Sequence, residues 1–171
     1  RLGFMRIAIL KETRDGETRV AASPETIKKL TAAGHQIVIE TGAGDYASSP
    51  DRLFVEAGAE IAADAKATLK GADLLLKVRR PSAAELKLVP KGAGVVAFWS
   101  PHSDKALIEA AAKAGVVALS MEFTPRITRA QAMDALSSQA NLAGYRAVIE
   151  GAALYGRGFP MMMTAAGTVA A

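Results

Sequence analysis

Five short apolar runs, separated by stretches with helical character, constrain the fold of this chain more than any other feature. The runs are residues 6–10, 35–40, 72–78, 95–99 and 116–120. Apolar residues follow one another within them instead of alternating with polar ones, as in strands covered on both faces. The predicted helices between them are residues 23–33, 50–57, 65–70 and 104–114. We therefore predict an α/β domain of three layers, with helices on both faces of a parallel sheet.

Polar and charged side chains gather where three of the predicted strands end, in residues 13–19, 77–81 and 100–103. Ligands of open parallel sheets bind outside the carboxyl ends of the strands. Arg19 and Lys77 could together hold a carboxylate or a phosphate, although surface charge or an internal ion pair explains them equally well. His102 stands where an acid or base would act, but the sequence identifies no partner for it.

Composition excludes several classes of function. The 171 residues contain no cysteine, which excludes disulfides and cysteine nucleophiles and fits a reducing cytosolic setting. No metal-ligand spacing is present, so we predict no metal site. The net charge of +4 is small and scattered, which gives nucleic-acid binding little support. No uncharged run approaches the roughly 20 residues of a membrane-spanning helix, and we expect no direct membrane insertion.

Two G-x-G-x-x-A matches resemble phosphate-binding loops, but their surroundings do not fit that function. Gly42, Gly44 and Ala47 follow a predicted strand, yet residues 48–50 are Ser-Ser-Pro, which interrupts the helix that a phosphate loop requires. The second match, which begins at Gly92, precedes a strand instead of following one. We interpret both matches as turns.

The stretch 125–149 has the length of a long helix, and one side of it is unusually polar. At 100° per residue, five short or uncharged polar side chains fall within about a quarter of the circumference: Gln131, Asp134, Ser138, Asn141 and Tyr145. Such a face either meets water or another domain, or makes specific hydrogen bonds, and the pattern alone favours the first. We predict a helix over 129–155, roughly 40 Å long, that links two domains, followed by a strand over 159–164.

Four sequence blocks carry a resemblance to a known family: MRIAILKETRDGETRVAASPETIKKL from Met5, LLLKVRRP from Leu74, RITRAQAMDALSSQANLAGYRAVIEGA from Arg126, and FPMMMTAAGTV from Phe159. Through them the chain resembles the NAD(H)-binding domain I of proton-translocating NAD(P) transhydrogenase, α subunit. The resemblance implies a Rossmann-like or flavodoxin-like domain over 5–125 and a cofactor loop with a long connecting helix over 126–155. Residues 156–171 would begin a second, dinucleotide-binding domain whose glycine-rich loop is missing.

The same resemblance implies a role for the loop that begins at Arg126. Arg126 would contact the nicotinamide end of NAD(H), and Gln131, the catalytic candidate, would lie between two nicotinamides during hydride transfer. Asp134 would accept a hydrogen bond from the ribose, with Ser137 nearby. Neighbours that would contact the cofactor by position are Ile127, Thr128, Ala132 and Met133. Hydride transfer needs two rings held close and aligned, so positioning supplies most of the catalysis.

The resemblance also implies partners. Hydride would pass from NADH to NADP⁺ on a separate NADP-binding domain, and membrane-spanning subunits would couple this step to proton translocation. The chain would be cytoplasmic, peripheral at the inner membrane through those subunits, and a homodimer to which the segment after Phe159 contributes. Alone, the fragment is expected to be inactive and to bind NAD(H) weakly.

Alanine dehydrogenase is the related alternative. Arg19 and Lys77 match the residues that hold the substrate carboxylate in that family. Its acid/base histidine should align near Ser100, whereas the histidine of this chain is His102, two residues further on. Imine chemistry needs a proton donor at the substrate carbon, so we favour the transhydrogenase interpretation. A fragment that only binds or assembles stays open as a third interpretation.

Overall fold

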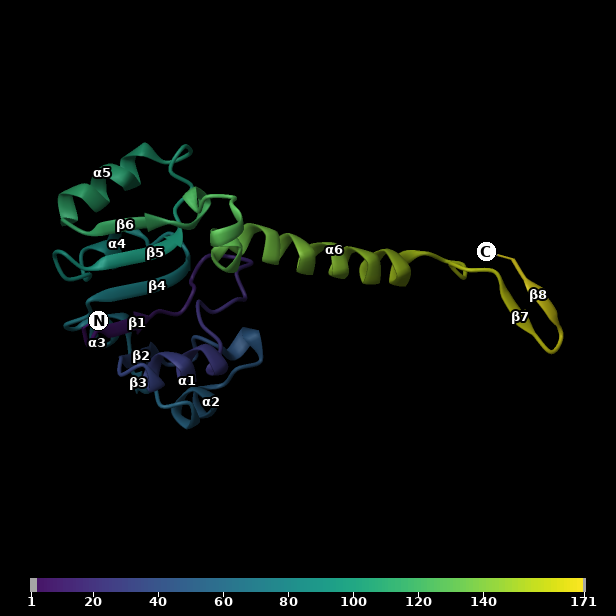
Figure 1. Cartoon of the computed structure of the whole chain (residues 1–171), viewed down its shortest axis with the longest axis horizontal. Helices are drawn as coiled ribbons and strands as arrows, with labels where there is room; N and C mark the ends of the chain where they lie inside the picture. Colours follow the sequence, from purple (N-terminus) through teal and green to yellow (C-terminus); the bar gives the residue numbers. More distant parts are fainter. Residues whose placement is uncertain (1–2, 171) are drawn as a thin grey trace. The chain divides into compact units, whose positions relative to one another are not determined.

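The structure is a computed structural model that describes residues 3–170. The chain divides into two compact units, the first ending at Phe123 and the second beginning at Thr124 (Figure 1). The first unit holds the sheet that the apolar runs predict. The second holds a long helix and a β-hairpin.

All strands of the first unit are parallel, in the order β3-β2-β1-β4-β5-β6 (Figure 1). Their bounds are β1 Arg6–Ile9, β2 Gln36–Glu40, β3 Glu60–Ala62, β4 Leu74–Arg79, β5 Gly94–Phe98 and β6 Val117–Ser120. The predicted parallel α/β fold is confirmed, and the predicted strands lie within two residues of the observed ones. The sequence analysis missed β3, because its three residues are partly exposed and form no apolar run.

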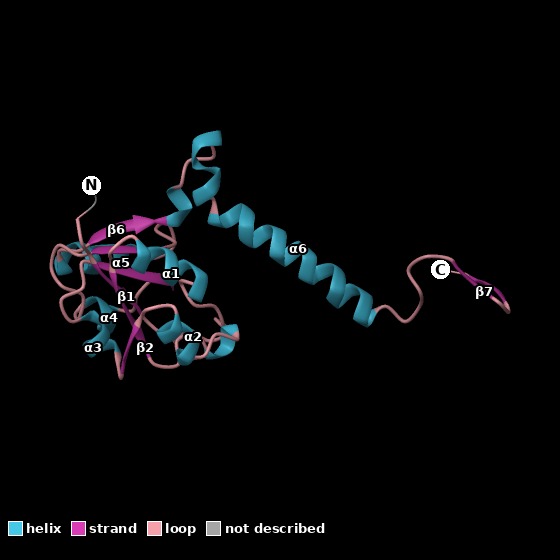
Figure 2. Ribbon diagram, turned by 60° about the horizontal axis from the view of Figure 1, so that its bottom comes forward, coloured by secondary structure: helices cyan, strands magenta, loops and turns pink. Residues whose placement is uncertain are grey.

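Helices lie on both faces of this sheet, around the strands in Figure 2. Their bounds are α1 Pro24–Ala32, α2 Asp51–Glu56, α3 Ala65–Leu69, α4 Ala83–Leu86 and α5 Lys105–Ala114. The four predicted helices are present, but the one-turn helix α4 was missed. A capping box forms it: Ser82 Oγ accepts from the Glu85 N–H, and the Glu85 carboxylate accepts from the Ser82 N–H.

Successive residues of β1 enter two separate cores, as the twofold repeat of a strand requires. Ile7 and Ile9 pack in the core that includes residues of α1 and α2, whereas Ala8 and Leu10 pack in the core that includes residues of α3, α4 and α5. A strand buried on both faces must be apolar at every position, which explains the continuous run in the sequence.

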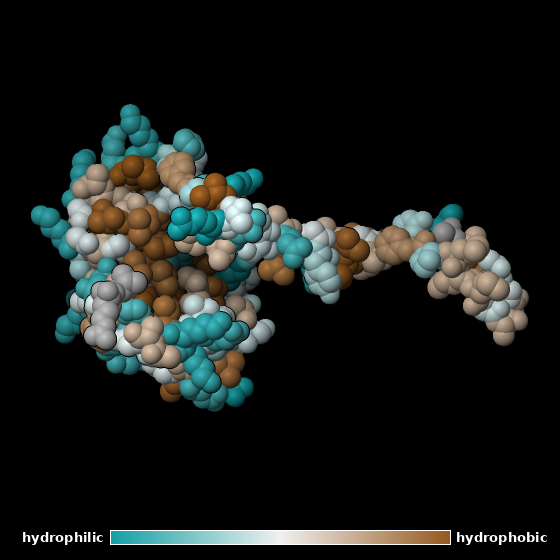
Figure 3. Space-filling model, viewed as in Figure 1, coloured by the Kyte–Doolittle hydropathy of each residue, from teal (hydrophilic) through white to brown (hydrophobic). Residues whose placement is uncertain are grey.

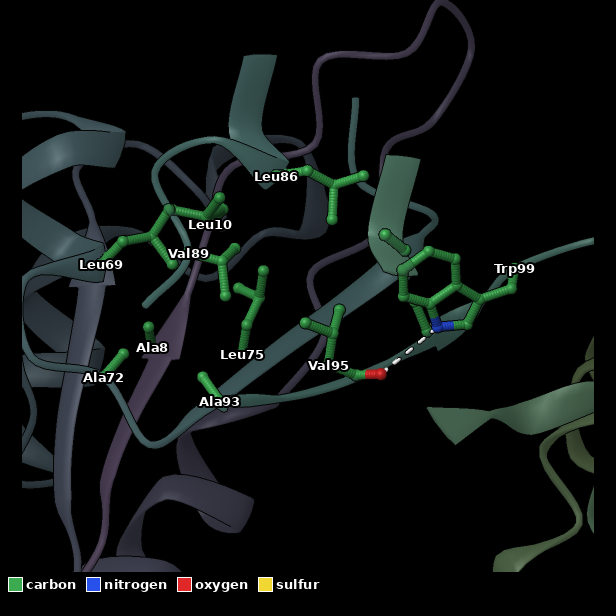
Figure 4. Packing of buried hydrophobic residues seen from close by; sticks show 12 residues of the cluster. Ala8, Leu10, Leu69, Ala72, Leu75, Leu86, Val89, Ala93, Val95 and Trp99 are labelled. Atoms are coloured by element: carbon green, nitrogen blue, oxygen red, sulfur yellow. Dashed lines mark hydrogen bonds between the residues drawn. The ribbon is translucent and has the colours of Figure 1, made fainter. Parts of the chain in front are cut away.

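Trp99, directly after β5, is among the largest fully buried side chains and closes one end of the second core. Its Nε1 donates to the Val95 carbonyl oxygen at 3.3 Å (Figure 4). The indole can therefore bury its ring without leaving a polar atom unpaired.

The segment with Gly42 and Gly44 is a turn, as the sequence analysis interpreted it. A 3₁₀ helix, η1 (Asp45–Ala47), follows Gly44, and Ser48 then adopts a left-handed conformation with φ 54°. A Cβ on Gly44 would lie 2.1 Å from the Ser49 carbonyl oxygen, so the glycine serves close packing of this turn.

The second unit starts with two turns rather than with one long helix. A 3₁₀ segment, η3 (Thr128–Met133), precedes helix α6 (Ala135–Leu154). The prediction of a helix from Arg129 was therefore wrong at its start, although its end differs by one residue only. Asp134 has ψ 81° and caps α6 with its side chain, so the helix cannot extend back through it. Gln131 and Asp134 thus lie ahead of the helix and share no helical face with Ser138.

Helix α6 exposes most of its side chains, apolar ones included. Leu142, Val148 and Leu154 are exposed, and apolar and paler side chains alternate along this helix in Figure 3. The polar side therefore does not mark one wet face opposite a buried one in the described chain.

The predicted strand at 159–164 is shorter than expected and has a partner that the sequence analysis did not foresee. Strand β7 (Met162–Thr164) pairs antiparallel with β8 (Gly167–Val169). Pro160 has no N–H for a ladder, which explains the later start. Gly167 has φ 129°, a conformation that L side chains rarely adopt, and it lets the chain turn back.

Candidate functional site

A cavity of about 530 Å³ lies at the carboxyl edge of the sheet, where the strand order reverses between β1 and β4. Its lining comes from the segments after β1 and β4 and from α4 and α5, and includes Glu12, Arg79, Arg80, Glu85 and Asp104. Such a reversal is where open α/β sheets bind ligands. The two residues predicted to hold an anion, Arg19 and Lys77, lie in or beside the segments that meet here.

Lys77 is buried among carboxylates. Its Nζ donates to Glu85 Oε1 at 2.8 Å and to the Lys11 carbonyl oxygen at 3.4 Å, and lies 3.7 Å from Glu12 Oε2. The Lys77 side chain is only 2% exposed. Burial raises the pKa of the Glu12 carboxyl above its ordinary value, although Lys77 and the backbone donors of Val78 and Arg79 pull it down.

Arg19 is paired as well. Its guanidinium donates from Nε and Nη2 to the two oxygens of Glu17, at 2.7 and 2.6 Å, and Arg79 Nε donates to Glu17 Oε2 at 2.8 Å. The hydrogen bonds from Arg19, with a smaller contribution from Arg79, lower the pKa of the Glu17 carboxyl to about 2. Of the two interpretations left open for Arg19 and Lys77, internal ion pairing is therefore the one observed.

His102 lies in the turn after β5, with its ring edge-on to Phe123 at 5.8 Å between ring centroids. Its side chain is exposed. Ser100, where an acid/base histidine would align, has φ 50°, and its N–H donates to Glu122 Oε1 at 2.6 Å. A serine hydroxyl titrates far above neutral pH and does not replace imidazole as an acid or base.

The second unit brings Arg126, Asp134 and Ser137 together in the loop 126–137. Ser137 donates to the Asp134 carboxylate twice, from N at 3.0 Å to Oδ1 and from Oγ at 2.6 Å to Oδ2. These bonds lower the pKa of Asp134, and the positive charge of Arg126 adds to the effect. An ionised carboxylate has about four acceptor positions, so Asp134 can cap α6 and still accept from a ligand.

The remaining predicted residues of this loop point away from any core. Their side chains are exposed: Arg126, Ile127, Thr128, Gln131, Ala132 and Met133. Ala130, in the middle of η3, is buried. The loop therefore has one inward apolar residue and an outer surface that includes an amide, a guanidinium and a methionine.

Glu122, just ahead of this loop, was missed by the sequence analysis. Its carboxylate accepts from Trp99 N at 3.1 Å, from Ser100 N at 2.6 Å and from Ser120 Oγ at 2.5 Å. The available signal was a lone acidic residue two positions after a strand-ending serine, which is too common a pattern to single out.

Within the described residues, no group of three or more histidine, cysteine or acidic side chains is arranged to hold a metal ion. Over the same part of the chain, no helix combines the length and apolar character needed to cross a membrane.

Comparison with known proteins gives consistent relatives. Residues 8–143 match the model of a family described as alanine dehydrogenase/PNT, N-terminal domain. An NAD(P) transhydrogenase subunit alpha of Rhodospirillum rubrum is 50% identical over 170 residues, which cover 96% of this chain and 44% of the relative.

Two solved structures agree. The transhydrogenase of Sinorhizobium meliloti superimposes with a TM-score of 0.90 at 51% identity, over 96% of this chain and 49% of that one. An L-alanine dehydrogenase superimposes with a TM-score of 0.69 at 30% identity, over 74% and 35%. The chain thus spans less than half the length of these relatives. The resemblance read from the four sequence blocks is confirmed, and the chain belongs to the alanine dehydrogenase/PNT N-terminal domain family.

Proposed function

We propose that this chain is the NAD(H)-side portion of a proton-translocating NAD(P) transhydrogenase and that loop 126–137 holds the nicotinamide end of the cofactor. The observation that carries the proposal is the preformed arrangement of this loop. Ser137 holds Asp134 in place, while Gln131 and Arg126 remain exposed beside it. The similarity to transhydrogenase α subunits supports it.

The residues of the loop fit a dinucleotide chemically. The Asp134 carboxylate has acceptor positions left for a ribose hydroxyl, and Ser137 fixes its orientation. The guanidinium of Arg126 offers planar donors to an amide or phosphate oxygen. Gln131 carries both a donor and an acceptor, which suits contact with a carboxamide on either ring. Bound NADH supplies the hydride, and the loop supplies orientation.

The wider function follows the same proposal. NADP⁺ would be held on a partner domain, membrane-spanning subunits would couple the transfer to proton movement, and the chain would be cytoplasmic, peripheral at the membrane through them. The domain plan would be 5–125, 126–155 and 156–171. The hairpin β7–β8 lies in the segment that we expect to contribute to a homodimer.

A second function, oxidation of alanine, receives less support from the site. Arg19 and Lys77 are engaged by Glu17, Glu85 and Glu12, and Ser100 stands where an acid/base is required. Rapid turnover of alanine with NAD by the full-length protein, without an NADP-binding partner, would favour this second function instead.

The decisive experiment changes Gln131 to Asn in the full-length enzyme. The amide is kept but withdrawn by one methylene, so hydride transfer should slow at least tenfold while the Kd for NADH changes less than about twofold. Gln36→Asn is the matched control, because Gln36 pairs with Glu60 at the other end of the sheet. Equal transfer rates in the two variants would remove Gln131 from the proposed role.

A further inference from the structure

We propose that Glu122 is a positioning residue that fixes the stem from which loop 126–137 leaves the first unit. The inference rests on the proposed function of that loop. It concerns a side chain that does not touch the cofactor-binding residues and acts through the backbone that leads to them.

The Glu122 carboxylate ties together the ends of two neighbouring strands. Its Oε1 accepts from Ser100 N at 2.6 Å, and its Oε2 accepts from Trp99 N at 3.1 Å, both just beyond the end of β5. Its Oε2 also accepts from Ser120 Oγ, at the last residue of β6. One side chain thus binds three donors at the ends of two strands.

The backbone at this point needs such an acceptor. The N–H groups of Trp99 and Ser100 lie beyond the last strand residue of β5, and Ser100 has φ 50°, which a serine keeps only when its surroundings hold it. An ionised carboxylate makes shorter and stronger bonds to backbone N–H groups than a neutral acceptor does. Burial alone would raise the pKa of Glu122, but the donors of Ser120, Ser100 and Trp99 outweigh it and lower that pKa, so the acceptor is charged at neutral pH.

The stem matters because of its place in the sequence. Glu122 precedes Phe123, the last residue of the first unit, and only three residues separate it from Arg126. A short segment passes a shift at its start on to the residues that follow. Reactions between two aligned rings are sensitive to such shifts, since a displacement of about 1 Å can cost a hundredfold in rate.

The test uses Glu122→Gln in the full-length enzyme. The amide keeps the size and one acceptor oxygen, but its NH₂ group cannot accept from a backbone N–H. We expect hydride transfer roughly tenfold slower with the NADH Kd within about twofold of the parent. Glu25→Gln, an exposed residue of α1, should leave both values unchanged. Ser120→Ala removes only the hydroxyl donor and should cost less than about twofold.

The outcomes separate the two proposals. An unchanged rate in Glu122→Gln, or a rate and an affinity that fall together, overturns the positioning role. If Gln131→Asn slows transfer while Glu122→Gln does not, only the present inference fails. If Gln131→Asn has no effect, the proposed function fails first. Should Glu122→Gln not fold, Glu122→Asp decides: it keeps the charge but shortens the reach, and an undiminished rate would again overturn the inference.

Discussion

Replacing Lys77 with methionine tests the buried ion pairs at the sheet edge most directly. Methionine keeps most of the volume of the side chain but removes the ammonium group that faces Glu85 and Glu12. Breaking a buried ion pair by removing one partner typically costs about 3–5 kcal/mol, because an uncompensated charge stays behind. The side chains of Lys77 and Glu12 are only 2% and 3% exposed, so water cannot replace the lost partner.

The magnitude can be worked out from the carboxyl that must adapt. Glu12 is the more buried of the two, and its pKa is already raised, so in the variant it takes up a proton. Protonating a carboxyl of ordinary pKa 4.5 at pH 7 costs about 3 kcal/mol, at about 1.4 kcal/mol per pH unit. Glu85 keeps its bond from the Ser82 N–H and stays ionised. We therefore expect Lys77→Met to lose about 3 kcal/mol of unfolding free energy at pH 7.

The sign of the pH dependence is fixed by the same carboxyl. A group whose pKa is raised in the folded state contributes stability that is present below its unfolded pKa and is lost as the pH rises through its folded pKa. The deficit of Lys77→Met should therefore shrink as the pH falls from 7 toward 4.5. Urea unfolding followed by the fluorescence of Trp99, the one tryptophan of the chain and buried in the same unit, measures it.

Lys29→Met is the matched control for this experiment. Lys29 pairs with Glu25 on the exposed side of α1, and such pairs contribute less than about 1 kcal/mol. A loss in Lys77→Met no larger than that of Lys29→Met, or a loss that does not shrink at lower pH, would refute the buried network.

Two further predictions concern the same unit and the long helix. Because Glu17 has a pKa of about 2 in the fold, its stabilisation is present above 4.5 and lost as the pH falls toward 2; Glu17→Gln should flatten the curve of unfolding free energy against pH in that window, and parallel curves would contradict the pairing with Arg19 and Arg79. Gly44→Ala should cost about 3 kcal/mol, since the added Cβ would overlap the Ser49 carbonyl oxygen, whereas Gly144→Ala, with open space in α6, should raise helix content in circular dichroism. Equal effects of the two glycine substitutions would contradict the packing described for the turn.

The sheet was predictable because its strands are buried on both faces and therefore continuous in sequence. The elements that were missed carry no such pattern: β3 is three partly exposed residues, α4 is one turn, and β8 depends on a partner strand. The start of α6 was misplaced because Asp134 and Ser138 have helical spacing, which an N-cap and the residue four positions later share. Spacing alone does not distinguish a cap from a helical residue.

The ion pairs at the sheet edge lay beyond the sequence for a different reason. Glu12 and Lys77 are far apart in the chain and meet only because β1 and β4 are neighbours in register. The residue types were visible, and the strand ends were predicted, but the sequence left open whether Lys77 would face a ligand or a carboxylate of its own chain. Strand order decides that question, and hydrophobic patterns do not encode strand order.

The two units therefore differ in how their polar groups are used. At the sheet edge, Glu12, Glu17 and Glu85 bind the cations that a substrate carboxylate would otherwise need, so this edge is chemically satisfied by the chain itself. In loop 126–137, Asp134 is held by Ser137, and Gln131 faces outward with its amide in solvent. Holding an amide and a guanidinium in solvent gives a fold no stability, whereas it lets them meet a flat polar ring. The division favours hydride transfer at the loop over amino-acid chemistry at the sheet edge, and the comparison of Gln131→Asn with Lys77→Met would show it: the first should lower the transfer rate without loss of stability, and the second should lower stability first.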